Sequence, residues 1–176
     1  MLGCLLEKQR TTPDQYPLSL NALRLACNQT TSREPVTDYD DATVRAALDK
    51  LGNRGWTRLA SGPGSRAAKF RHLLDDALQL SPPLLALLAV LMLRGPQTAA
   101  ELRTRSERLH AFASNDEVEA TLRELAEREL ADEGARHRWR HLLGGDEPAT
   151  APPPSDLESR VAELERIVAE LQERMG

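Results

Sequence analysis

The side chains best suited to chemistry in this sequence are basic and amide groups on one face of residues 40–54, DDATVRAALDKLGNR. The apolar residues of this segment recur at spacings of three and four, which places them on one side of a helix: Val44, Ala47, Leu48 and Leu51. The opposite side then carries Arg45, Lys50, Asn53 and Arg54. Arginine and asparagine donate hydrogen bonds to base edges in the DNA major groove, and lysine and arginine contact phosphates. The segment therefore predicts a DNA-recognition helix.

A basic hairpin is expected directly after this helix. Gly52 and Gly55 can adopt the left-handed backbone conformation that ends helices. Two runs with extended character, residues 57–61 and 67–73, flank a Gly-Pro-Gly sequence, which is the pattern of a hairpin loop. The basic side chains of the hairpin are Arg58, Arg66, Lys69 and Arg71. A helix followed by a basic hairpin predicts a winged-helix domain, in which the hairpin contacts the DNA backbone beside the groove.

A surface without DNA contact is the alternative interpretation of the same residues. Arg45 and Asp49 are four residues apart and can form an ordinary ion pair on a solvated helix face. Asp49 also lies in the middle of that face, where it would repel phosphate. Because winged helices serve both DNA and protein recognition, the second hypothesis is a protein–protein interaction adaptor without DNA binding. Arg24 and Arg33 are further candidates for DNA contact under the first hypothesis.

The distribution of charge favours nucleic-acid contact at only one end of the chain. The 176 residues carry a net charge of −4, with 23 basic and 27 acidic side chains. Residues 1–74 have 11 basic and 7 acidic side chains, residues 75–145 have 9 and 12, and residues 146–176 have 3 and 8. The net charges of these segments are thus +4, −3 and −5. We therefore expect double-stranded DNA, if it is the partner, to contact residues 1–74.

A similar order of elements is predicted twice along the chain. The helix-start signals in the second copy are Ser81, the capping pair Thr98 and Glu101, and the capping pair Ser114 and Glu117. A short hairpin is expected around Gly134. The predicted fold class is mostly α with small β-hairpin wings, arranged as tandem winged-helix domains at 1–74 and 75–143, the second with a short wing. The third helix of the second domain is acidic, so we expect it to serve protein contact or dimerisation.

The C-terminal part of the chain predicts a linker and a coiled coil. Residues 144–155, GGDEPATAPPPS, have nothing to bury and form the expected flexible linker. In residues 156–176 the apolar positions alternate four and three apart: Leu157, Val161, Leu164, Val168 and Leu171. A β-branched residue at position a with leucine at d favours a parallel two-stranded coiled coil. We therefore expect a homodimer, with the alternative that this helix packs back on the second domain.

A dense set of polar residues near the first turn has two interpretations. The set comprises Glu7, Lys8, Thr11, Thr12, Gln15, Tyr16, Asn28, Gln29 and Arg33. These side chains could form a ligand or partner site. We favour instead a structural role, in which capping and turn hydrogen bonds fix the first helix against the second.

Catalysis, a metal site and a cofactor are not expected. Cys4 and Cys27 lie on apolar helix faces, where cysteine is usually a small core residue. His137 and His141 have no further cysteine or carboxylate cluster to complete a metal site, and the glycine-rich loop after Ser61 leads into a strand rather than a helix. Two cysteines make no disulfide framework, so a cytoplasmic location is expected. The longest apolar run, at 84–93, is ten residues long and too short to cross a membrane.

One resemblance covers essentially the whole chain. The run CLLEKQRTTPDQYPLSLNALRLACNQTTSREPV at residues 4–36 closely resembles the signature of the YceH family of bacterial proteins. The segment LRGPQTAAELRTRSERL at residues 93–109 and the tail after a proline-rich linker also match. The resemblance implies a tandem winged-helix architecture and no particular activity. Family members usually carry several more residues before the segment that matches Leu2, which indicates either a misassigned start at Met1 or a shortened first helix. The second hairpin is also shorter than is typical.

Overall fold

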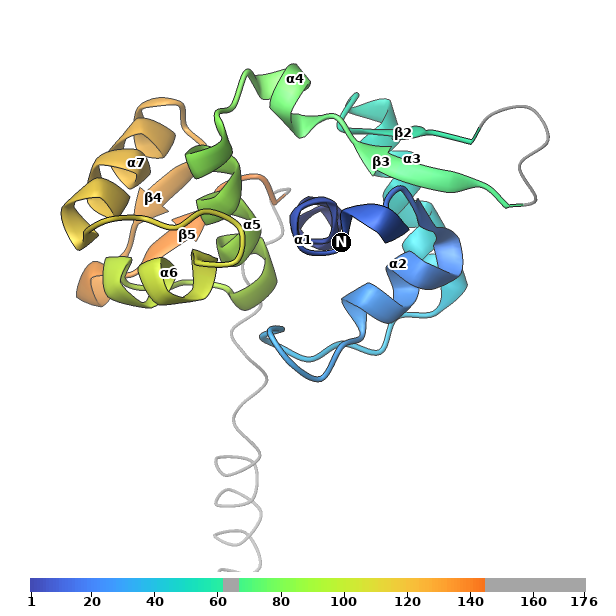
Figure 1. The fold of residues 1–176 in the computed structure, drawn as a ribbon, viewed down its shortest axis with the longest axis horizontal. Helices are drawn as coiled ribbons and strands as arrows, with labels where there is room; N and C mark the ends of the chain where they lie inside the picture. The colour runs from blue at the N-terminus through green and yellow to red at the C-terminus, as the bar shows by residue number, and fades with distance from the viewer. Residues whose placement is uncertain (62–66, 145–176) are drawn as a thin grey trace, which may run out of the picture. The chain divides into compact units, whose positions relative to one another are not determined.

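The computed structural model describes residues 1–61 and 67–144 as a mostly helical protein with small antiparallel sheets (Figure 1). The first half contains α1 (Leu2–Thr11), the 3-10 turn η1 (Pro13–Gln15), β1 (Leu18–Ser19), α2 (Leu20–Cys27), α3 (Asp41–Asn53), β2 (Thr57–Leu59), β3 (Lys69–His72) and α4 (Leu74–Leu78). The second half contains α5 (Pro82–Arg94), α6 (Ala99–Ser106), α7 (Asn115–Glu127), β4 (Ala131–Glu133), the 3-10 turn η2 (Ala135–His137) and β5 (Trp139–His141). The fold is compatible with a winged-helix-like architecture.

In each half an antiparallel hairpin follows the three main helices along the chain. In the first half β3 pairs with both β2 and β1, so that Phe70 lies opposite Leu59 on one side and Leu18 on the other. The sequence pattern does not predict β1, because a strand of two residues has no periodicity. In the second half β4 pairs with β5, and an isolated bridge between Gln97 and Trp139 occupies the place that β1 has in the first half. The order of elements therefore repeats along the chain.

Local capping explains where the predicted helices begin. The Asp40 carboxylate accepts a hydrogen bond from the Thr43 N–H at 2.8 Å and starts α3. The predicted capping box of Thr98 and Glu101 is present at the start of α6. Only one of the two hydrogen bonds predicted for the capping box at the start of α7 is present. The Ser114 hydroxyl accepts from the Glu117 N–H, but the Glu117 carboxylate accepts from the N–H of residue 113 rather than from Ser114.

Helix α1 contributes to two hydrophobic cores. Leu2 and Leu6 pack with α5 and the helices of the second half, whereas Leu5 packs with α2 and α3 of the first half. Figure 1 shows α1 between α5 and α2. Residues 1–143 accordingly form one compact unit. The division of this unit into two winged-helix domains stays a prediction, as do the linker and the coiled coil, which lie outside the described residues.

The contact between α1 and α5 has no room for a side chain at Gly3. A Cβ atom at this position would lie 2.9 Å from the Met92 Cβ, 3.1 Å from the Leu93 Cγ and 3.2 Å from the Ala89 carbonyl oxygen. The nearest of these atoms is close to the backbone of α5 and cannot rotate away. Glycine is therefore required at residue 3 by helix packing, although it lowers helix propensity by about 1 kcal/mol relative to alanine.

We predict that Gly3→Ala lowers the free energy of unfolding, because overpacking typically costs about 1–3 kcal/mol and exceeds the gain in helix propensity. Gly52→Ala in α3 is the matched control. Its Cβ would meet nothing closer than 3.9 Å, so this substitution is expected to raise stability by up to about 1 kcal/mol. Urea unfolding of the full chain measures both changes. Equal stabilisation by the two alanines would show that α1 does not pack closely on α5.

A buried histidine fastens the hairpin of the first half to α1. The side chain of His72, in β3, is completely buried, and its Nε2 is hydrogen-bonded to the Gln9 Oε1. The Leu74 N–H donates to the His72 Nδ1, so the neutral ring carries its proton on Nε2. The Tyr16 hydroxyl accepts from the His72 N–H at 2.8 Å. Burial lowers the pKa of His72 below its ordinary value of 6.5, although Asp75 nearby opposes this shift.

Stability should therefore fall on mild acidification. A histidine whose pKa is lower in the folded state binds fewer protons than the unfolded chain, so its contribution is complete above about pH 6.5 and is lost as the pH falls below that value. His72→Gln should reduce the loss of unfolding free energy between about pH 7 and pH 5. Burial also lowers the pKa of His141, so the double variant with His141→Gln should show a still flatter profile. Profiles with unchanged slopes would contradict this prediction.

Candidate nucleic-acid interface

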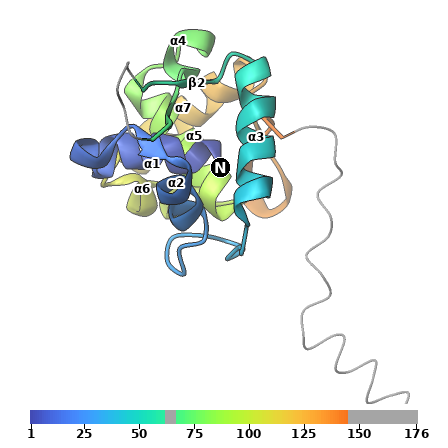
Figure 2. The ribbon, with the colours of Figure 1, turned by 90° about the vertical axis from the view of Figure 1, so that its right-hand side faces the viewer.

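The predicted recognition helix presents its basic face to solvent. Arg45, Lys50, Asn53 and Arg54 are all exposed, while Val44 and Leu48 are buried in the core. Figure 2 shows α3 on the outside of the first half, with its long side uncovered. Arg45 and Asp49, the pair that the alternative interpretation requires, form no ion pair in the described part of the chain. The cations of α3 are therefore available to a partner.

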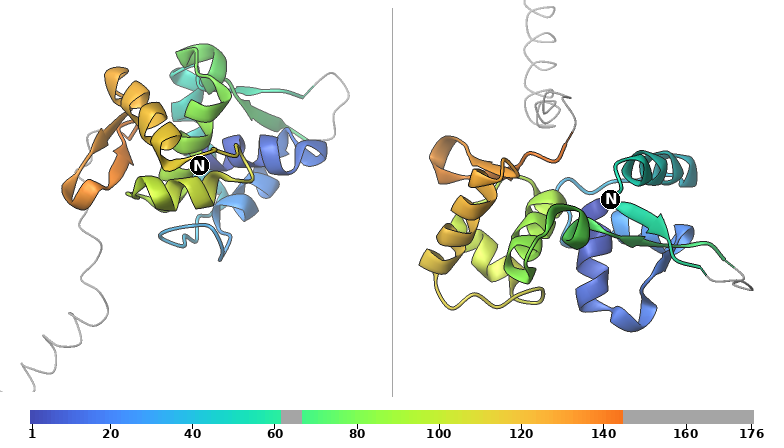
Figure 3. Two further views of the ribbon diagram at one scale, coloured as in Figure 1. Left: turned by 60° about the vertical axis from the view of Figure 1, so that its left-hand side comes forward. Right: turned by 90° about the horizontal axis from the view of Figure 1, so that it is seen from above.

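The hairpin adds basic side chains beside α3. Arg58 on β2 and Lys69 on β3 are exposed, and Figure 3 shows the two strands next to α3. Arg58 lies directly opposite Arg71 in the β2–β3 register. Like charges in that arrangement destabilise a hairpin, and an anionic partner would relieve the repulsion. Arg66, the remaining predicted wing residue, lies outside the described residues.

Acidic groups occupy the N-terminal end of α3. Asp41 forms an ion pair with Arg24 at 2.9 Å, so Arg24 is committed to α3 rather than free for phosphate. Hydrogen bonds from Thr43 lower the pKa of Asp40, which keeps this carboxylate charged. At the opposite end of the helix, the Arg54 guanidinium lies over the Trp56 ring, 5.1 Å from its centroid. The positive surface thus consists of the C-terminal half of α3 and the hairpin.

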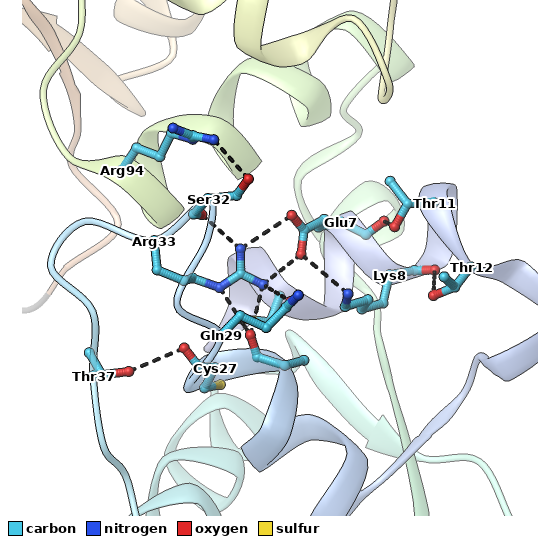
Figure 4. Close-up of polar contacts among 12 residues, drawn as sticks. Glu7, Lys8, Thr11, Thr12, Cys27, Gln29, Ser32, Arg33, Thr37 and Arg94 are labelled. Atoms are coloured by element: carbon cyan, nitrogen blue, oxygen red, sulfur yellow. Dashed lines mark hydrogen bonds and ion pairs between the residues drawn. The ribbon is translucent and has the colours of Figure 1, made fainter.

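Arg33 is a structural residue, so its suggested role in DNA contact is wrong. Only 9% of the residue is exposed. Its guanidinium forms two hydrogen bonds with the Glu7 carboxylate, at 3.2 and 2.6 Å, and donates to the Ala26 and Ser32 carbonyl oxygens and to the Gln29 side chain (Figure 4). All five N–H donors of the guanidinium are thereby satisfied. Burial disfavours the charge of Arg33, but the hydrogen bonds that it donates to Glu7, together with nearby negative charge, raise its pKa.

The favoured structural interpretation of the polar set agrees with these contacts in most respects. The Thr11 and Thr12 hydroxyls donate to carbonyl oxygens of their own helix, those of Glu7 and Lys8. The Asn28 side chain is hydrogen-bonded to both the N–H and the carbonyl oxygen of Tyr39. The set therefore joins α1 to the loop after α2 and joins that loop to the start of α3.

We predict that Arg33→Ala lowers the free energy of unfolding by about 3–5 kcal/mol, because it leaves the partly buried Glu7 carboxylate without its partner. Arg45→Ala, at an exposed site, is the matched control and should change stability by less than about 0.5 kcal/mol. Thermal or urea unfolding of the two variants makes the comparison. Equal effects would mean that the Glu7–Arg33 pair adds no stability.

Most arginines of α7 and of the β4–β5 hairpin are paired with carboxylates. On α7, Arg123 pairs with Glu119 at 2.9 Å, and Arg128 pairs with Glu124 at 2.7 Å. In the hairpin, the Arg140 guanidinium donates two hydrogen bonds to the Asp132 carboxylate, and Arg138 contacts Glu101 and the carbonyl oxygen of residue 96. These contacts leave α7 and its hairpin with few cations free for a partner.

Other kinds of site find little support in the part of the chain that is described. Cys4 and Cys27 are both buried in the hydrophobic core that contains Leu5 and residues of α2 and α3. Among residues 1–61 and 67–144 no group of three or more His, Cys, Asp or Glu side chains could hold a metal ion. No helix in these two ranges is long and apolar enough to span a membrane. The predicted dimer contacts from Leu157 to Leu171 lie outside the described residues.

The described residues form a mostly helical protein with antiparallel hairpins, in an order of elements that is compatible with a winged-helix-like architecture. Residues 1–137 match the family model described as "Protein of unknown function, DUF480". The chain is 47% identical over 195 residues to a UPF0502 protein of Pelobacter propionicus, an alignment that covers 100% of this chain and 89% of the relative. It is 43% identical over 196 residues to a UPF0502 protein of Pectobacterium carotovorum, covering 100% and 93%. A UPF0502 protein of Dechloromonas aromatica is 48% identical over 192 residues, covering 98% and 89%. The chain therefore belongs to the bacterial DUF480/UPF0502 family. This membership confirms the resemblance to the YceH signature.

Proposed function

We propose that this protein is a tandem winged-helix, transcription-regulator-like protein that binds double-stranded DNA through its first half. The observation that carries the proposal is the contrast in charge compensation between the halves. Among the described residues the cations of α3 and the β2–β3 hairpin have no carboxylate partners. In contrast, both arginines of the α7 segment, and Arg138 and Arg140 of the β4–β5 hairpin, pair with carboxylates. Unpaired cations on a helix and an adjacent hairpin are suited to a base-reading helix flanked by phosphate contacts.

In the proposed complex, α3 lies in the major groove. Asn53 and the arginines of α3 supply donors for base edges, while Lys50 contacts phosphate. The hairpin lies beside the groove and contacts the backbone through Arg58, Lys69 and Arg66. The second half and the coiled coil predicted at 156–176 serve dimerisation, and two copies would then bind two half-sites. This arrangement agrees with the net charges of the three segments of the chain.

The second candidate function is a protein–protein interaction adaptor built on the same helices. It is favoured by Asp49, which lies within the basic face, and by Leu59, which is 58% exposed among the cations of the hairpin. Leu25 and Val36 are also more than half exposed. A partner protein with an acidic, partly apolar surface would match this mixture of side chains.

DNA binding can be tested by fluorescence anisotropy of random-sequence duplex DNA against the full chain. The four cations proposed to contact phosphates give a slope of about −3.6 for log affinity against log salt, so affinity should fall by roughly a hundred-fold between about 50 and 200 mM salt. Lys50→Glu/Arg54→Glu should weaken binding about tenfold or more and make the slope shallower. Arg123→Glu/Arg128→Glu on α7 is the matched control and should change affinity less than about twofold, because those cations are not proposed to contact phosphate.

Absence of binding even at low salt would refute the DNA proposal and favour the adaptor. Equal weakening by the two double variants would also refute it, since the attraction would then come from total charge rather than from α3.

A further inference from the structure

A second group of basic side chains lines a cleft away from α3 and the β2–β3 hairpin. The cleft lies between α1, the loop that follows α2, the end of α5 and the end of α6, and has a volume of about 170 Å³. Its cationic lining residues are Lys8, Arg94, Arg105 and Arg108, and Glu7 is its single carboxylate. Glu7 is paired with Arg33 at 2.6 Å, and Lys8 lies 4.0 Å from the same carboxylate, so the cleft carries an excess of positive charge that comes mainly from Arg94, Arg105 and Arg108.

The cations of the cleft are incompletely neutralised by nearby carboxylates. Arg105 donates to the Gln97 Oε1 at 2.7 Å and lies 3.7 Å from Glu101, but that carboxylate is also engaged by the Thr98 cap and by Arg138. Arg108 makes no hydrogen bond or ion pair within residues 1–61 and 67–144. The cleft therefore holds positive charge that the described residues leave without a full counter-charge.

Arg94 and a serine hydroxyl line part of the positive region. The Arg94 guanidinium donates to the Ser32 Oγ at 2.8 Å, as Figure 4 shows, which leaves the hydroxyl hydrogen of Ser32 free to bind an acceptor. Burial and the nearby charges of Arg105 and Arg33 lower the pKa of Arg94, while Glu34 opposes this shift. An anion in the cleft would relieve the repulsion among these arginines and accept hydrogen bonds from them.

The size of the cleft limits the ligand. Liquid water occupies about 30 Å³ per molecule, so the volume corresponds to about six waters. Pockets for drug-sized molecules are larger, about 300–1,000 Å³. The cleft thus suits one or two phosphate groups. Arginine forks and a hydroxyl donor match phosphate oxygens, which offer more acceptors than a carboxylate does.

We propose that this cleft is a binding site for a small phosphate-bearing anion of two or more negative charges, with pyrophosphate as its simplest form. Lys8 and Ser32 come from the first half, and Arg94, Arg105 and Arg108 come from the second. A bound anion would therefore hold α6 against α1 and against the loop after α2. The proposal does not depend on DNA binding, since no residue of α3 or of the β2–β3 hairpin lines the cleft.

The test is isothermal titration calorimetry of the full chain with sodium pyrophosphate at constant ionic strength, with sulfate and citrate as competing anions. We expect saturable binding of one pyrophosphate per chain, and weaker binding of citrate. Arg108→Ala and Lys8→Ala each remove one charged hydrogen bond and should weaken pyrophosphate binding about tenfold or more. Arg10→Ala is the matched control, because Arg10 is an exposed cation on α1 that does not line the cleft.

Three outcomes would overturn the proposal. The first is the absence of pyrophosphate binding to the unmodified chain. The second is equal binding by the Arg108→Ala, Lys8→Ala and Arg10→Ala proteins, or loss of binding in the Lys50→Glu/Arg54→Glu protein, either of which would place the anion elsewhere. The third is citrate binding as tight as that of pyrophosphate, which would rule out selection for phosphate. Unfolding curves of each variant without anion separate a loss of ligand contact from a loss of folding.

Discussion

The close packing of α1 against α5 is the constraint on which the rest of residues 1–143 depends. Gly3 allows the two helix backbones to approach, and the residues beside it then enter two different cores. Leu2 and Leu6 join the apolar helices of the second half, and Leu5 joins α2 and α3. The polar side of α1 also connects distant segments, because Glu7 pairs with Arg33 of the loop after α2 and Gln9 is hydrogen-bonded to His72 of β3. One helix of ten residues thus fixes the loop before α3 and the hairpin after it.

The two halves use the same order of elements but treat charge in opposite ways. The helices α3 and α7 hold equivalent places in that order, each before a hairpin. On α7 the arginines are placed four residues after glutamates and pair with them, and in the second hairpin Arg140 pairs with Asp132. On α3 the corresponding pair of Arg45 and Asp49 is not formed. A surface of unpaired cations gains more from contact with a polyanion than one whose cations are already neutralised, since no ion pairs must first be broken.

The cations of α3 and those of the cleft, of which Arg108 is exposed and the others are half-buried, differ in the ligand that they suit. Exposed side chains on a helix and a hairpin can follow an extended polyanion, and their attraction is strongly screened by salt. The cleft collects its cations from three helices around a small volume, where screening is weaker and a compact anion is favoured. The two surfaces share α1 as a neighbour: Lys8 lines the cleft, and the adjacent Gln9 holds His72 of β3. Helix α1, which is packed on both sides, therefore connects the two surfaces.

Local pattern determined much of this protein. The apolar spacing and the capping residues predicted α3 and α6 closely, the Gly-Pro-Gly sequence predicted the β2–β3 hairpin, and the run at residues 4–36 identified the family. These features are local in the chain, or are matched residue by residue, and need no knowledge of distant contacts. Exposure of Arg45, Lys50 and Lys69 also followed from periodicity alone.

Only the tertiary structure decided which polar residues are structural and which are free. Arg33 and Arg24 resemble the other arginines in sequence, but long-range contacts with Glu7 and Asp41 commit them to the fold. The sequence indicated the polar residues around Lys8 as a possible ligand site, but it did not indicate the arginines that complete the cleft, because Lys8 is about one hundred residues away from Arg105 and Arg108. Gly3 and β1 were not predicted for the same reason. The need for glycine at residue 3 arises from its packing against α5, and the two residues of β1 form a strand only because they pair with β3. Sequence periodicity fixes the face on which a side chain lies, while chain folding fixes what that face meets.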